Sequence, residues 1–372
     1  MVSDVEVRID RLRPREVAER MAAGPVAWIP LGAVEYHAEH LPFGTDGFTA
    51  TAVVERAARI AGGVVLPWSA LTIGTLALPW SLRYDADLVE RALRSTIEQA
   101  AAHGARVVVV HTGHGPLDLN HLIKRVCADT EARIGATPGN AGFRAYGLCY
   151  LELNAARGVQ LGTDWPVAVD HGAVMETSWT LAVAPELVRL ERLPEDPDGT
   201  MLAVYGPNPR TRASAETGEA QVQGAAELLA ARVQELLAGG RIDPLADLRG
   251  FVARYWPEPL ELGARAGMAG SAAITLRNVG PVSRYVTGCA LRIDGVPVDP
   301  AGMVLSNPTV GETGVPFPVT TLGPEAGFYV RRLQEAELRI PVALGPGPVA
   351  VELTLGLGGV TETTLRATLR PA

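Results

Sequence analysis

Three segments of the chain carry histidines, two of them together with acidic residues, and could therefore bind a metal ion. The residues, segment by segment, are Glu35, His37, His40 and Asp46; His111 and His114; and Asp170, His171 and Glu176. Imidazole nitrogens and carboxylate oxygens together suit zinc, manganese or iron. None of the seven histidines comes after His171, so any imidazole chemistry belongs to the first half of the chain.

The spacing within these segments favours a shared site but also allows plainer interpretations. In an extended segment Glu35 and His37 point to the same side, because side chains alternate along the chain. If a helix begins at Asp170 and runs to about Val183, His171 and Glu176 lie roughly 140° apart around it. A charged side chain in such an apolar helix is rarely buried unless it is paired or bound to a metal. The alternatives are polar loops in solvent and an exposed Glu176.

The elements that must position these residues follow from the apolar pattern. Strands are predicted at residues 26–31, 64–66, 107–110 and 146–151, and helices at about 47–61, 85–102, 118–134, 170–183 and 213–237. This alternation predicts a mainly parallel sheet covered by helices. Because the first two histidine segments directly follow predicted strands, they fall at the carboxyl edge of the sheet, where open α/β sheets bind their ligands.

The last hundred residues have a different hydrophobic pattern. Short alternating strands are predicted at 273–276, 289–293, 336–340, 349–355 and 361–369, with a turn at Asp294-Gly295. We expect a first domain over residues 1–243, a linker over 244–268, and an all-β sandwich over 269–372. The β domain contains no histidine, so its expected role is interaction, either as an oligomer contact or as a lid.

Charge and composition exclude several classes of protein. The net charge is −8 and Lys124 is the only lysine, so the basic face that a nucleic-acid-binding protein needs is missing. No apolar run approaches the length of a membrane helix, and the first residues do not resemble a secretory signal. Three widely spaced cysteines suit a reducing compartment. We therefore expect a cytoplasmic protein without a nucleic-acid or membrane partner.

Together, the three segments resemble the creatininase (creatinine amidohydrolase) family over residues of about 8 to 238. The first is similar to the family's Glu-x-His-x-x-His-Leu-Pro-x-x-Thr-Asp motif, from Glu35 to Asp46. The other elements, in the family's order, are Gly74-Thr75, His114 in the place of the histidine of Asn-Gly-His-Gly-Gly-Asn, and His171 with Glu176-Thr177-Ser178.

The resemblance implies a three-layer α/β/α sandwich that holds two divalent metal ions, Zn, Mn or Fe, in each chain. One ion would be held by Glu35, Asp46 and His114, and the other by His37, Asp46 and Glu176, with Asp46 bridging. A metal-bridging hydroxide would attack an amide-type C–N bond, and His171 would pass a proton to the leaving nitrogen. The catalytic residues would thus be His171 and Glu176. Family members often form rings, so a homo-oligomer is expected.

The resemblance also bears on the substrate, which would be a small cyclic amide, formamide or peptide-like amide. Creatininase itself has a ligand glutamate two residues after the motif histidine, where this chain has Pro116. Glu176 must then supply that ligand, and creatinine is not the favoured substrate. Both motif asparagines are replaced, by Thr112 and Leu117, and Asp118 is a candidate substitute. Tyr36 and Trp165 are the candidate substrate-binding residues.

Two other functions stay open at this stage. The chain could be a metal-bearing scaffold whose β domain binds a carbohydrate or a protein partner. It could also be a sugar-processing enzyme, because the segments 292–298 and 338–355 resemble the small β subunit of C-glycoside deglycosidases.

Overall fold

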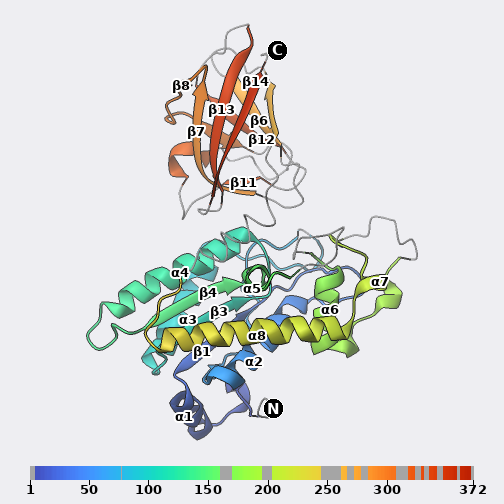
Figure 1. The fold of residues 1–372 in the computed structure, drawn as a ribbon, viewed down its shortest axis with the longest axis vertical. Coiled ribbons are helices and arrows are strands. Elements are labelled where there is room, and N and C mark those ends of the chain that lie inside the picture. Colours follow the sequence, from blue (N-terminus) through green and yellow to red (C-terminus); the bar gives the residue numbers. More distant parts are fainter. Residues whose placement is uncertain are drawn as a thin grey trace. The chain divides into compact units, whose positions relative to one another are not determined.

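The computed structural model describes residues 5–76, 78–159, 170–194, 203–243, 261–265, 272–277, 284–306, 317–322, 328–330, 335–341, 347–357 and 361–369. The chain divides into two compact units, Met1–Phe251 and Val252–Ala372. Figure 1 draws the helices and strands of the first unit in blue to yellow and those of the second in orange to red. None of the described helices combines the length and the hydropathy that crossing a membrane requires.

The first unit is built on a parallel sheet whose strands finish at the same level. Among the described residues the strand order is β2 (Val64–Val65), β1 (Val26–Leu31), β3 (Val107–Thr112) and β4 (Arg144–Cys149). The register pairs Leu31 with Thr112 and Thr112 with Cys149, so three strands end side by side. β1 and β3 are buried throughout, as their continuous apolar runs predict.

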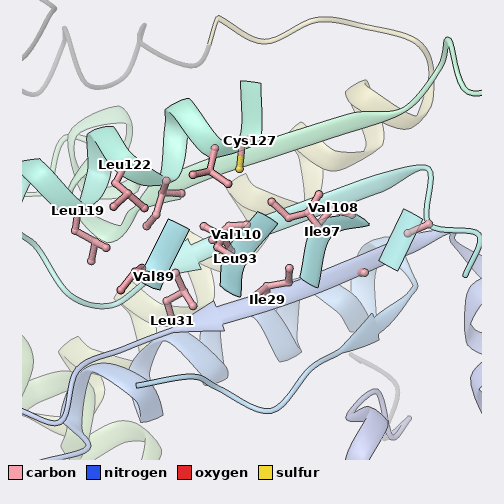
Figure 2. Close-up of a cluster of buried hydrophobic side chains, with 14 of the residues drawn as sticks. Ile29, Leu31, Val89, Leu93, Ile97, Val108, Val110, Leu119, Leu122 and Cys127 are labelled. Atoms are coloured by element: carbon pink, nitrogen blue, oxygen red, sulfur yellow. The ribbon is translucent and has the colours of Figure 1, made fainter. Parts of the chain in front are cut away.

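Helices cover both faces of this sheet, as the three-layer prediction requires. The described helices are α1 (Pro14–Ala23), α2 (Thr45–Ala61), α3 (Ala86–Ala102), α4 (Leu117–Gly135), α5 (Tyr150–Arg157), α6 (Val174–Val183), α7 (Pro209–Arg212) and α8 (Ala215–Leu237), with 3-10 turns at Ile9–Arg11, Pro185–Leu187 and Leu190–Arg192. Figure 2 shows Val110 of β3 packed with Leu93 and Ile97 of α3. The next strand residue, His111, faces the opposite side and lines a cavity with residues of α2 and α8.

One strand boundary differs from the prediction of a strand over 146–151. β4 ends at Cys149, and Tyr150 begins α5. The physical reason is a buried carboxylate, because Glu152 accepts a hydrogen bond of 2.8 Å from the backbone N–H of Cys149 and so closes the first turn of α5. Lys124 Nζ lies 2.7 Å from the same carboxylate and compensates its charge.

The second unit consists of two antiparallel sheets, as predicted. One has the order β10 (Phe317–Pro318), β9 (Val304–Ser306), β12 (Glu335–Ile340), β6 (Ala272–Arg277) and β5 (Glu261–Arg265), and the other β11 (Phe328–Val330), β7 (Arg284–Ile293), β13 (Val349–Leu357) and β14 (Thr361–Leu369), with β8 (Val296–Pro297) beside β7. A 3-10 turn at Val319–Thr321 follows β10. Leu338 of one sheet and Leu353 of the other belong to one buried apolar cluster, which makes the unit a sandwich.

The expected linker contains a strand. β5 falls inside residues 244–268 and pairs with β6 from Glu261 to Arg265, whereas residues 244–260 and 266–268 lie outside the described part of the chain. Its central Gly263 and charged ends weaken the alternating pattern that identifies the other strands. The boundaries of the two domains remain a proposal.

A close helix contact gives a test of the packing. A Cβ added at Gly218 of α8 would lie 1.9 Å from the backbone oxygen of Ser178 in α6. We expect Gly218→Ala to force these helices apart and to lower the free energy of unfolding by about 1–3 kcal/mol, measured by chemical denaturation.

A second glycine of the same helix provides the control. A Cβ at Gly224 would meet only the guanidinium group of Arg157, which is the end of a flexible side chain. Alanine favours a helix over glycine by about 1 kcal/mol. This gain should offset the cost of moving the guanidinium group, so Gly224→Ala should be close to neutral. Equal stability of the two variants would contradict the packing of α6 on α8.

Candidate metal centre

The residues of the three sequence segments meet at the carboxyl edge of the parallel sheet. Glu35 and His37 lie in the loop after β1, and Asp46 is the second residue of α2. His114 follows β3, and Glu176 lies in the first turn of α6. All five side chains are buried, each with 5% or less of its surface exposed. The interpretation of Glu176 as an exposed helix residue is therefore wrong.

Asp46 lies between the two histidines. One carboxylate oxygen, Oδ1, is 3.1 Å from His37 Nε2, and the other, Oδ2, is 3.1 Å from His114 Nδ1. Each histidine also approaches a glutamate. His114 Nδ1 is 3.0 Å from Glu35 Oε2, and His37 Nε2 is 3.4 Å from Glu176 Oε2. The arrangement is thus two groups of three ligand-type residues that share one carboxylate.

Among the described residues, three clusters could hold a cation, with their ligand atoms within 4.8 Å of one another. They are Glu35, Asp46 and His114; His37, Asp46 and Glu176; and Glu35, His37 and His171. The first two match the ligand sets that the family resemblance implies. The third adds His171 as a neighbour of Glu35 and His37.

Several polar atoms of this cluster are buried without a hydrogen bond, which is the state expected of metal ligands. They are Glu35 Oε2, His37 Nε2, Asp46 Oδ2 and His114 Nε2. His37 Nε2 is within 3.1 Å of Asp46, but its geometry does not meet that of a hydrogen bond. Its Nδ1 instead lies 3.0 Å from the Glu35 carbonyl, which can only accept, so Nδ1 carries the hydrogen and Nε2 faces the site. The donor set therefore fits a cation.

The pKa shifts of the site also indicate that it can hold a cation. Burial opposes charge on His37, but Asp46 and Glu176 outweigh it and raise the pKa of that imidazole to about 10. Burial likewise opposes charge on His114, and Glu35 and Asp46 hold its pKa well above the ordinary value. Burial also raises the pKa of Glu176 well above the ordinary range. The site thus gathers negative charge that protons or metal cations must compensate.

His171 has a different environment and stays neutral. Its Nε2 lies 3.0 Å from the Tyr36 carbonyl, which can only accept, so Nε2 carries the hydrogen. Nδ1 is then unprotonated and lies 4.0 Å from Glu176 Oε2. The ring stacks on His37 at 4.3 Å between centroids. Burial and the charge of His37 lower the pKa of His171 to about 4.

Glu176 is held by the start of its own helix. The backbone N–H of Gly172 donates to Glu176 Oε2 at 2.6 Å. α6 begins at Val174 rather than at Asp170, the predicted cap, because the chain turns at Gly172 with φ +56°. Asp170 still closes the helix, since its carboxylate accepts from the backbone N–H groups of Met175 at 2.5 Å and Glu176 at 3.3 Å. Burial raises the pKa of Asp170 to about 7.

Other predicted residues lie elsewhere. His40 binds Thr177 at 2.9 Å and His111 faces α2 and α8, so neither joins the three clusters. Tyr36 is partly buried and its hydroxyl donates to Glu39 at 2.6 Å. Trp165 lies outside the described residues. The roles of Tyr36 and Trp165 in substrate binding remain predictions.

Thr112 has a structural role that the sequence did not predict. Its hydroxyl contacts both backbone groups of His114, accepting from the N–H at 3.0 Å and donating to the carbonyl at 3.1 Å. Thr112, which stands where the family motif has its first asparagine, thus holds the backbone of His114. Asp118, the candidate substitute, instead accepts from the N–H of Leu119.

Comparison with known proteins places this site in a family. A family model for creatininase, creatinine amidohydrolase, matches residues 10–233. A creatinine amidohydrolase of Pseudomonas putida is 29% identical over 210 residues, which cover 52% of this chain and 78% of that protein.

Solved structures agree with that match. A crystal structure of creatinine amidohydrolase superposes with a TM-score of 0.51 at 27% identity, covering 63% of this chain and 99% of the other. A mutant creatininase of Zn–Zn type gives a TM-score of 0.51 at 25% identity, covering 62% and 98%. Since the family model spans more than half of its residues and ends before the second unit, this chain belongs to the creatininase family through its first unit.

Proposed function

We propose that this chain hydrolyses an amide-type C–N bond of a small molecule at a centre of two divalent cations. The observation that carries the proposal is the bridging position of Asp46, whose two oxygens each lie 3.1 Å from a different histidine. A carboxylate in that position can bind one cation through each oxygen. The relative of Zn–Zn type supports two zinc ions, and manganese or iron would suit the same donors.

The ligands divide between the two cations. Glu35, Asp46 and His114 would hold one, and His37, Asp46 and Glu176 would hold the other. Bound there, the metals would supply a water of lowered pKa as nucleophile and a Lewis acid for the scissile carbonyl. Pro116 offers no ligand, so Glu176 completes the second set. Burial of all five side chains shields them from bulk solvent and so strengthens these interactions.

We propose His171 as the residue that moves the proton. Its Nε2 hydrogen is held by the Tyr36 carbonyl, so the ring presents the free Nδ1 toward Glu176 and the centre. An imidazole that is neutral at pH 7 can take a proton at Nδ1 and pass it to the leaving nitrogen. Stacking on His37 fixes the plane of the ring.

We propose a narrower range of substrates for this chain than for the family as a whole. A cyclic amide, a formamide or a small peptide-like amide would each present a planar C–N bond to this site. Creatinine is not favoured, because Pro116 replaces the ligand glutamate of creatininase itself. We propose Tyr36 and Trp165 as pocket residues, with the Tyr36 hydroxyl oriented by Glu39.

Replacing His171 tests its assignment as the proton carrier. We expect His171→Ala to lower kcat by about 10²- to 10⁴-fold in a screen of amides, lactams and formamides, with metal content unchanged. His103→Ala, at the exposed end of α3, is the matched control and should keep full activity. Loss of metal in His171→Ala would instead make His171 a ligand, and unchanged activity would contradict its catalytic role.

The pKa of His37 leads to a second expectation. Without metal this imidazole has a pKa of about 10 and is protonated at pH 8, whereas a metal ligand must be neutral. Binding of Mn²⁺ should therefore release protons, and affinity should rise by about tenfold per pH unit for each proton released. Titration calorimetry in buffers of different ionisation enthalpy measures the release. Affinity independent of pH between 6 and 9 would contradict this account.

A further inference from the structure

We propose that the hydrogen bond between His40 and Thr177, called the tie below, holds His37 and Glu176 at the separation that binding one metal ion requires. The inference rests on the proposed function, because it concerns the geometry of that centre. His40 is a positioning residue in this account and not a ligand.

The ligands concerned come from distant parts of the chain. His37 lies in the loop after β1 and Glu176 in α6, yet their ligand atoms are 3.4 Å apart. The contact between His40 and Thr177 joins these two segments beside the ligands. His40 comes three residues after His37, and Thr177 directly follows Glu176.

The contact between His40 and Thr177 is short and buried. His40 Nε2 lies 2.9 Å from Thr177 Oγ1, and the two residues expose 1% and 0% of their surfaces. The backbone N–H of Arg189, beyond the end of α6, donates to the His40 carbonyl at 2.9 Å. The loop residue is therefore held from its side chain by α6 and from its backbone by the segment that follows α6.

The backbone between His37 and His40 shows why a tie is needed. Ala38 adopts a φ of +60°, a left-handed conformation that residues other than glycine rarely take. Such a conformation persists only where surrounding contacts impose it. The His40 contact on one side and the His37 contact with the Glu35 carbonyl on the other, at 3.0 Å, supply that constraint.

A ligand role for His40 fits the structure less well. Its Nε2 is occupied by the Thr177 hydroxyl. Its Nδ1 is buried without a hydrogen bond, but His40 belongs to none of the clusters of ligand atoms among the described residues. A second contact, from His171 Nε2 to the Tyr36 carbonyl, joins the same two segments. Removing the His40 tie should therefore weaken one metal site and not abolish it.

The test removes the Thr177 hydroxyl at nearly constant volume. We expect full-length Thr177→Val to bind one Mn²⁺ with wild-type affinity and the second about 10- to 100-fold more weakly, as measured by stepwise titration calorimetry. The electron paramagnetic resonance spectrum should shift from a spin-coupled pair toward an isolated ion at equal loading. Thr177→Ser, which keeps the hydroxyl, should restore the second equivalent.

Thr180→Val is the matched control. Thr180 is a fully buried threonine on the same helix, but its hydroxyl donates within α6, to the Glu176 carbonyl at 2.8 Å, and not to the loop. It should bind both ions as the wild type does. If Thr177→Val fails to fold, His40→Gln and His40→Phe replace it, and only the glutamine, which keeps a polar group within reach, should retain the second ion.

The outcomes separate this inference from the proposed function. A wild type that does not take up two ions overturns the proposed function and the tie with it. A wild type that binds two, with both affinities unchanged in Thr177→Val, overturns the tie alone. Equal weakening of both ions, or the same loss in Thr180→Val, shows a general structural effect and also overturns it.

Discussion

The buried carboxylate of Asp46 is the constraint on which the candidate metal centre depends. A carboxylate with 1% of its surface exposed needs compensating charge, and Asp46 receives it from two imidazoles and from the N-terminus of α2, in whose first turn it lies. The strands β1 and β3 deliver one histidine each, because they end at the same level. Glu35 and Glu176 bring two further carboxyl groups, and two protonated imidazoles can balance only two of the three negative charges. The raised pKa of Glu176 reflects this excess together with its burial.

Much of this arrangement can be predicted from the sequence because strong local signals coincide. The four valines of β3 are typical of a buried strand, so His111 and His114, which follow these valines, were expected at the carboxyl edge of the sheet. The ligand set came from the resemblance to a family motif, and the buried clusters agree with it. Spacing alone could not separate His37, which faces the cluster, from His40, which binds α6.

Contacts between distant segments were the part that could not be predicted. The start of α5 depends on Glu152 accepting from Cys149 and on the charge of Lys124, which comes from another helix. The brace of His114 by Thr112 depends on a loop geometry that the sequence does not encode by spacing. β5 became recognisable only through its pairing with β6, since its own pattern is weak. In each case tertiary contacts decided the local structure.

The second unit has no assigned part in this chemistry. Its two sheets enclose their own apolar core, and the family match ends before it begins. It holds no histidine, and none of the clusters of potential metal ligands in the described residues falls within it. An interaction role, as a partner contact or a lid, remains the proposal for this unit.

The central claim is that Asp46 bridges two metal ions, and metal analysis tests it most directly. Protein purified without added metal should carry about two equivalents of zinc, manganese or iron per chain, as a dinuclear centre requires. Asp46→Ala should lose both ions while keeping the fold, judged by circular dichroism. A wild type that carries no metal and takes up none on addition, or an Asp46→Ala variant with unchanged metal content, would contradict the account.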